Sequence, residues 1–261
     1  MPTEPRQTIF PALRYADARA ALDFFERAFG FERLAVFDGL DGSVAHAEMR
    51  LGTAAIAFSS ATPPDGRNPW TSVRCGIYAV RPDAAAVDAL AARAERAGAR
   101  IAQPLHDTNY GSLECSIRDV AVHLWSFGTY TWAPVGEPSL FVGLQVHDAM
   151  ATMAWLCEVF GFARGLVVPA GDEAIAHAEL HLDGSVLMLW SEGQAAGWFT
   201  ERQSTSIWVE DADAHYAGAV AGGARIVAPL ADTSYGARGY SALDVDGFVW
   251  TFSTYRPQPL P

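Results

Sequence analysis

The stretch "DTSYGARGYSALDVDGFVWTFSTY", residues 232–255, nearly repeats an earlier stretch, "DTNYGSLECSIRDVAVHLWSFGTY", residues 107–130. In the later copy, apolar residues on either side of "DVDG" predict two strands joined by a tight turn. The earlier copy has "DVAV" at that place, so it lacks a glycine that adopts a positive φ at low cost. It also has "SLEC" where the later copy has "ARGY". The chain therefore carries a duplicated strand pair of which one copy has changed.

The duplication extends over most of the chain. "FPALRYADARAALDFFERAFGF" from Phe10 aligns with "FVGLQVHDAMATMAWLCEVFGF" from Phe141, and "HAE" and "GARI" each occur twice in the same order. We therefore predict a first domain over residues 1–131 and a second over 139–261. The linker, 132–138, contains proline and glycine, as is typical of a domain boundary.

Each half of each domain shows the same order of patterns. An alternating strand leads into a helix such as "DAMATMAWLCEVFG", which has a capping aspartate at Asp148 and a terminating glycine at Gly161. Three strands follow, two of them joined at "DG", a strong hairpin signal. The pattern predicts an α+β protein built from four βαβββ modules.

Composition limits the possible partners. The 261 residues are 50% hydrophobic and 18% charged, with a formal net charge of -12. This acidity argues against a nucleic-acid partner and against docking on anionic lipid. No apolar run is long enough for a membrane helix, the first residues lack a signal-peptide pattern, and the 3 cysteines are scattered. We therefore expect a cytoplasmic protein with no membrane partner.

The repeated features together resemble the vicinal oxygen chelate superfamily, also called the glyoxalase / bleomycin-resistance / dioxygenase family. The resemblance rests on the helix ends at Asp17–Gly30 and Asp148–Gly161, the "HAE" strands, the "GARI" segments and "YGARGYSALDVDGFVWTF". It implies two glyoxalase-like domains with curved mixed sheets, in each of which two modules form one sheet with the site on its concave side. It also implies paired domains, so we expect a monomeric pseudo-dimer or a homodimer.

Metal-dependent members of the family place ligands in the first and last strands of each module. The positions that the resemblance marks carry no usual set of donors: Phe10, Ala57, Arg74, Ser126, Phe141, Leu189, Ser204 and Thr251. Zinc and similar cations need three or four nitrogen, oxygen or sulfur donors. We therefore expect no metal and no other cofactor.

Strand alternation and the loops next to it predict which side chains face the cavity of the second domain. The expected ligand-binding residues are Phe141, Gln145, His181, Trp198, Ser204, Ser206, Trp208, Tyr235, Arg238 and Thr251. The counterparts in the first domain are Phe10, Arg14, His46, Glu48, Arg74, Tyr78 and Tyr110. Trp250 has the opposite parity and is expected in the core. Because the first domain has changed, we expect it to be partly scaffold.

Two features of the second domain have competing interpretations. His177 and Glu179 share one strand face with His181 and could act as an acid/base pair, but a hydrogen-bonded polar face or a metal site would give the same pattern. Arg238 could hold an anionic ligand, or could pair with a surface carboxylate.

The leading hypothesis is a metal-independent binding protein that sequesters an antibiotic or another planar aromatic compound in an aromatic-lined cavity. The alternative is a metal-independent enzyme of secondary metabolism, an isomerase, lyase or hydrolase, with His177 and Glu179 as its acid/base groups. A protein-interaction module has no sequence feature of its own here.

Overall fold

The structure is a computed structural model that describes residues 7–61, 74–120, 123–130, 140–193 and 203–257. Its contacts divide the chain into two compact units. The described residues of Val142–Pro257, together with the start of the first strand as far as Pro11 and with residues 74–75 at the start of the fifth strand, form what we call the C-terminal unit. The described residues of Ala12–Pro64 and Gly76–Phe141 form the N-terminal unit. The predicted linker, 132–138, lies outside the described residues.

The C-terminal unit contains two consecutive βαβββ modules. The first consists of β9 (Leu140–Val146), α3 (Ala149–Phe160), β10 (Ala163–Pro169), β11 (Ile175–Leu182) and β12 (Ser185–Ser191). The second consists of β13 (Gln203–Trp208), α4 (Ala212–Ala221), β14 (Arg225–Asp232), β15 (Arg238–Leu243) and β16 (Val249–Ser253).

The N-terminal unit repeats this order. Its first module consists of β1 (Ile9–Tyr15), α1 (Ala18–Phe24), the π-helical turn η1 (Phe25–Phe29), β2 (Glu32–Asp38), β3 (Val44–Leu51) and β4 (Ala54–Ser60). Its second consists of β5 (Arg74–Val80), α2 (Ala84–Arg96), β6 (Arg100–Asp107), β7 (Leu113–Arg118) and β8 (Leu124–Gly128).

The strands form two eight-stranded mixed sheets, which confirms the predicted α+β class. Their orders are β14-β15-β16-β13-β1-β4-β3-β2 and β10-β11-β12-β9-β5-β8-β7-β6. The two modules of one unit therefore belong to different sheets. The expectation that consecutive modules share a sheet was wrong, because hairpin and helix signals fix the strands inside a module but not the partner of its first strand.

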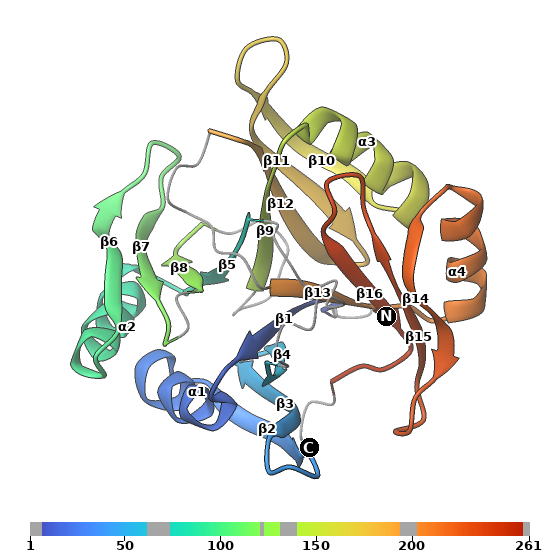
Figure 1. The fold of residues 1–261 in the computed structure, drawn as a ribbon. Coiled ribbons are helices and arrows are strands. Elements are labelled where there is room, and N and C mark those ends of the chain that lie inside the picture. The colour runs from blue at the N-terminus through green and yellow to red at the C-terminus, as the bar shows by residue number, and fades with distance from the viewer. Residues whose placement is uncertain (1–6, 62–73, 121–122, 131–139, 194–202, 258–261) are drawn as a thin grey trace, which may run out of the picture. The chain divides into compact units, whose positions relative to one another are not determined.

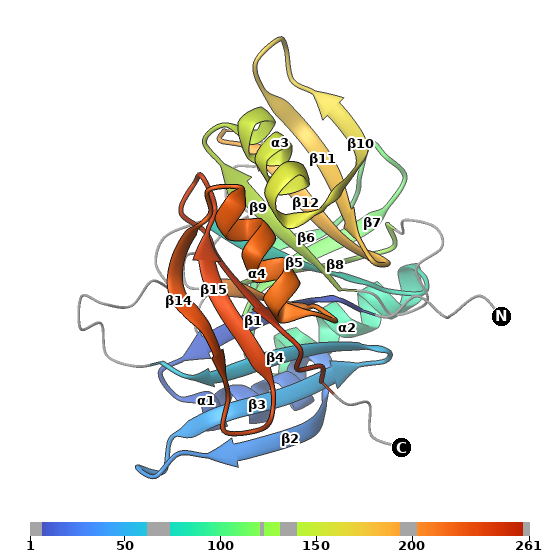
Figure 2. The ribbon, with the colours of Figure 1, turned by 90° about the vertical axis from the view of Figure 1, so that its right-hand side faces the viewer.

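Local sequence signals explain the elements of the C-terminal unit. The Asp148 side chain accepts a hydrogen bond from the Ala151 N–H at 2.9 Å, and Gly161 ends α3 with a φ of 76°. At the hairpin, Asp183 and Gly184 both have positive φ, as the "DG" pair predicts. Figure 1 shows α3 alongside β10–β12, and Figure 2 shows it next to α4.

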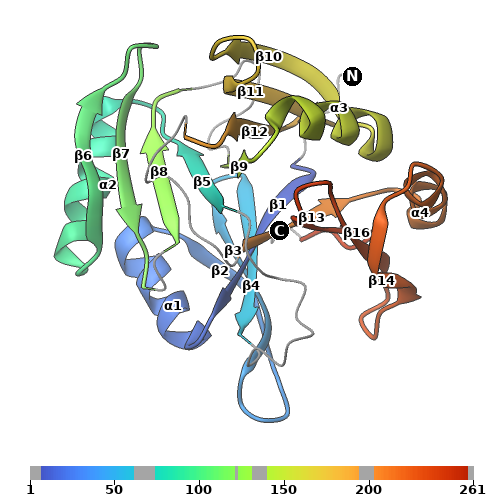
Figure 3. The ribbon, with the colours of Figure 1, turned by 45° about the horizontal axis from the view of Figure 1, so that its top comes forward.

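Each unit has its own aromatic core between helices and strands. Trp250 is fully buried in the C-terminal unit, which confirms its predicted position, and its ring packs edge-on against Phe160 at 6.0 Å. In the N-terminal unit, Trp125 packs among Phe25 and Phe29. Figure 3 shows α2 beside β6 and β7.

In the described part of the chain, no helix combines the length and the apolar character needed to cross a bilayer.

Candidate ligand-binding site

One polar face of the N-terminal unit is built from β5, β7 and β8. Tyr78 is paired with Ser126, Ser116 is opposite Ser126, and Glu114 is opposite Gly128. Because strand residues alternate, these five residues point to the same side. The residues between them, such as Trp125, point into the core.

Glu114 is a fully buried carboxylate on this face. The Tyr78 hydroxyl donates a hydrogen bond to Glu114 Oε1 at 2.9 Å. The other oxygen, Oε2, is buried and accepts no hydrogen bond from the described residues. Burial, and next the charge of Glu114, raises the pKa of the Tyr78 phenol well above its ordinary value. The phenol therefore stays protonated and remains a hydrogen-bond donor.

A row of aromatic rings leads from this carboxylate to the surface. The Tyr78 and Phe141 rings are nearly parallel, 8° apart, with centroids at 6.2 Å. Tyr130 packs edge-on against Tyr78 at 6.4 Å and against Tyr110 at 5.7 Å. Tyr110 is 56% exposed, and burial followed by the charge of Glu114 raises its pKa. The row therefore ends at the surface in the exposed phenol of Tyr110.

Gly128 leaves the space that the Glu114 and Tyr78 side chains occupy. A Cβ at this position would lie 2.6 Å from Glu114 Cγ and would also collide with the Tyr78 hydroxyl. The later copy has Gly239 opposite Ser253 at the corresponding pair, so the small residue has changed strand. Glu114 is not among the residues predicted from the sequence, although the replacement of "ARGY" by "SLEC" marks its position.

A second polar face lies on β11 and β12. His177 Nε2 lies 3.2 Å from Glu179 Oε1, and Glu179 is fully buried. The first domain has the same contact between His46 and Glu48, at 2.9 Å. Glu179 is opposite Met188 in the strand pairing.

The remaining predicted residues of β9 and β11 lie in this same sheet. Gln145 is paired with Trp190 and is almost completely buried. His181 lies against Gly165, since a Cβ at Gly165 would collide with its ring. Phe141, although it belongs to β9, clusters with the N-terminal unit.

The predicted residues of β13 and β16 belong to the other sheet. Ser206 is paired with Thr251, and the Ser241 and Thr251 hydroxyls lie 3.0 Å apart. Ser204 is fully buried, and the Arg256 guanidinium lies 3.9 Å from the Trp208 ring centroid. The single shared sheet predicted for His181 and Thr251 is therefore corrected: their strands belong to two different sheets.

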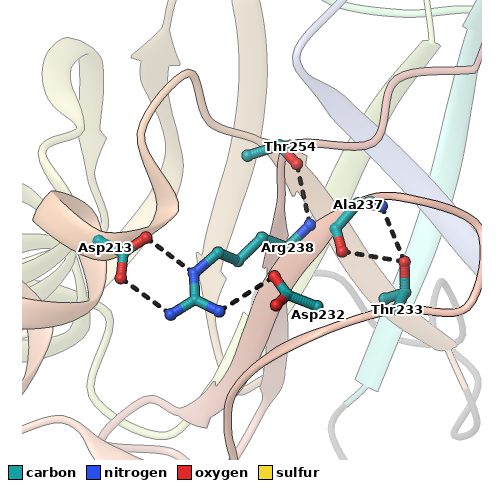
Figure 4. A network of polar contacts seen from close by, with 6 residues as sticks. All are labelled: Asp213, Asp232, Thr233, Ala237, Arg238 and Thr254. Carbon is teal, nitrogen blue, oxygen red and sulfur yellow. Dashed lines mark hydrogen bonds and ion pairs between the residues drawn. The ribbon is translucent and has the colours of Figure 1, made fainter.

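Figure 4 shows Arg238 engaged with two carboxylates. Asp213 accepts two hydrogen bonds from its guanidinium, at 2.8 and 2.9 Å, and Asp232 accepts a third at 3.0 Å. This is the surface pairing expected as the alternative role of Arg238. Tyr235 is 66% exposed and packs edge-on against Tyr255. Trp198 lies outside the described residues.

The donor set does not fit the metal site of metal-dependent family members. Phe10 and Phe141 are buried aromatics, and Ser126 and Thr251 each lie within hydrogen-bond distance of a neighbouring serine hydroxyl. Leu189 is buried in the core, and its neighbour Met188 is opposite Glu179, as Ala57 is opposite Glu48. Among the described residues, no three His, Cys, Asp or Glu side chains are grouped to hold an ion.

Comparisons with known proteins agree with this architecture. A family model for the Glyoxalase/Bleomycin resistance protein/Dioxygenase superfamily matches residues 9–127 and again residues 140–252. The chain therefore belongs to this superfamily, and the double match confirms the internal duplication.

Several individual proteins are also similar to this chain. An uncharacterized protein of Mycobacterium bovis is 31% identical over 124 residues, which are 45% of this chain and 80% of that protein. Glyoxalase I from Zea mays has a TM-score of 0.76 at 15% identity, covering 95% of this chain and 92% of that one. A putative dioxygenase from Bacillus subtilis has a TM-score of 0.65 at 13% identity, covering 98% and 87%. These structures are similar in fold only.

Proposed function

We propose that this protein binds a small planar aromatic compound, such as an antibiotic, without a metal ion. The observation that carries the proposal is the parallel stack of Tyr78 on Phe141, within 8°, on a face that also carries hydroxyl groups. Flat apolar rings accept a flat ligand, and a few polar groups orient it. Ser112, which lies 3.3 Å from the Tyr78 hydroxyl, and Ser126 are such groups.

This proposal places the binding role in the earlier copy, which we had expected to be partly scaffold. In the later copy, Arg256 already covers the Trp208 ring, and Arg238 is engaged by two aspartates. A ligand there would have to displace an arginine side chain from its partner. The aromatic row of the earlier copy ends in the exposed ring of Tyr110, which a ligand can reach directly.

The test is a titration of chelator-treated protein with acridine, a planar probe, followed by its fluorescence. Tyr110→Ala should weaken binding by roughly fivefold to tenfold, because an aromatic contact is lost. Tyr235→Ala is the matched control, since Tyr235 is also exposed and also packs edge-on against a tyrosine. The control should bind acridine like the unchanged protein.

Three results would count against the proposal. The first is no saturable binding of acridine, and the second is equal loss in the two variants. The third is binding that appears only when a divalent metal is added back. Mass spectrometry of the recovered probe completes the test, because a binding protein returns its ligand unchanged.

A second candidate function is a metal-independent enzyme that uses His177 and Glu179 as acid and base. The 3.2 Å contact between them favours it, since a buried carboxylate can orient an imidazole. The same contact between His46 and Glu48 favours a structural role instead. Turnover that His177→Ala abolishes without changing affinity would support the enzyme.

A further inference from the structure

We propose that Glu114 is the subsite for a positively charged nitrogen of the ligand, an ammonium, an amidinium or a protonated ring N–H. The inference rests on the proposed function and adds the charge of the ligand to it. The ligand class is then a cationic planar aromatic compound.

Glu114 is a buried carboxylate without a counter-charge in the described part of the chain. Among the residues that the structure describes, Glu114 forms no ion pair, and its hydrogen bond to Oε1 comes from a neutral phenol. A buried carboxylate costs free energy unless it is paired and hydrogen-bonded. A ligand N–H directed at Oε2 would supply both the charge and the missing hydrogen bond.

The fold does not require this carboxylate. In the later copy, the corresponding strands β15 and β16 pair Gly239 with Ser253. Gly239 stands at the position of Glu114, and Ser253 at the position of Gly128. The strand pair therefore forms without an acid at this position. A buried acid that the sheet does not need is best explained by what it binds.

The aromatic rings around the Glu114 carboxylate suit a delocalised cation. The rings of Tyr78, Tyr130 and Phe141 offer faces and edges to a delocalised cation. The net charge of -12 attracts cations to the protein as a whole. Tyr110, the exposed end of the row, packs on Tyr130, and Tyr130 packs on Tyr78 next to Glu114, so the row of rings connects the carboxylate to the surface.

The experiment compares two probes of nearly the same shape at pH 7.5. 9-Aminoacridine is cationic at this pH and acridine is neutral. The unchanged protein should bind the cation at least about tenfold more tightly, as a buried charge-assisted hydrogen bond implies. Glu114→Gln keeps the size of the side chain and removes its charge, so it should abolish the preference while acridine binds within about threefold of its original affinity.

Glu32→Gln is the matched control for net charge. Glu32 is exposed and accepts a hydrogen bond from the Arg50 guanidinium at 2.6 Å, so this variant loses one charge away from the aromatic row. It should keep the preference for 9-aminoacridine.

The outcomes separate the two proposals. If both probes bind and Glu114→Gln keeps the preference, the subsite is wrong and the proposed function stands. If the unchanged protein binds both probes equally, the subsite is overturned without any variant, even if Glu114→Gln fails to fold. If neither probe binds, the proposed function fails and the subsite fails with it.

Discussion

Glu114 and Gly128 are directly opposite each other on β7 and β8, and a Cβ at Gly128 would lie 2.6 Å from Glu114 Cγ. The buried acid and the glycine are therefore a coupled pair, since the first occupies space that the second leaves. In the later copy the glycine, Gly239, is on β15 and Ser253 is opposite it on β16. Each copy therefore has one glycine in this residue pair, on β8 in the earlier copy and on β15 in the later copy.

We predict that Gly128→Ala lowers the free energy of unfolding by about 1–3 kcal/mol, because the new methyl group overpacks Tyr78 and Glu114. Urea unfolding measures this change. The displaced side chains should also weaken acridine binding.

Gly218→Ala is the control for the loss of a glycine. Gly218 lies inside α4, and a Cβ there would meet nothing within 4 Å. This variant should stabilise the protein by about 0.5–1 kcal/mol, since alanine is the better helix former. If the two variants change the free energy of unfolding equally, then the space at Gly128 is not needed for Tyr78 and Glu114.

The two tryptophans of the β13–β16 module should respond differently to removal. Trp250→Ala should lower the free energy of unfolding by about 3–5 kcal/mol, because the indole is fully buried and bonded to Asp244. Trp208→Ala should lower it by no more than about 1–2 kcal/mol, because the ring is only partly buried and stacks under the Arg256 guanidinium. Thermal unfolding followed by circular dichroism distinguishes them. A larger loss for Trp208 would show that the faces of β13 and β16 are assigned the wrong way round.

Local signals in the sequence were enough to predict the modules. Aspartate and glycine at the helix ends, alternation in the strands and the "DG" turn are interactions between near neighbours, so they predict α3, β11, β12 and the buried face of β16. Residues 121–122, where the earlier copy lacks its "DG", lie outside the described residues. Next to them, His123 occupies the place of Phe248 and its Nδ1 lies 3.2 Å from Asp119.

Non-local relations could not be predicted. Which sheet a module joins depends on the partner of β9 or β13, and neither strand carries a pattern that identifies that partner. Glu114 was missed because a charged residue in a strand is usually read as solvent-facing. Its burial follows from Tyr78 and Gly128, which are distant in sequence. Glu179 illustrates the same point. Strand alternation predicts that it lies on a polar face, but does not predict that its side chain is fully buried.

His177→Ala should therefore destabilise the protein even though His177 lies on a polar face. It would remove the imidazole next to the fully buried Glu179 carboxylate, and a buried acceptor that loses a partner costs about 1–3 kcal/mol. Urea unfolding at pH 7 measures this. The double variant His177→Ala/Glu179→Gln should recover part of the loss, because the remaining group is no longer charged. No recovery would show that the two side chains are not coupled.

The last prediction concerns Asp244, whose pKa is raised from 3.8 to about 6, mainly by burial. Its Oδ2 accepts a hydrogen bond from Trp250 Nε1 at 2.9 Å, which opposes the shift but does not cancel it. Because the pKa is higher in the folded state, the protonated acid favours folding. This contribution is complete below about pH 4 and is lost as the pH rises through about 6.

Asp244→Asn removes the titration and keeps a carbonyl oxygen for Trp250. The difference in unfolding free energy, unchanged protein minus variant, should fall by about 3 kcal/mol or less between pH 4 and pH 7. Asp172→Asn, at an exposed position, is the charge-matched control and should show no such trend. Urea unfolding at several pH values measures both differences. If the Asp244 difference stays constant or rises with pH, then the carboxylate is already charged in the folded state at low pH, and its hydrogen bonds outweigh its burial.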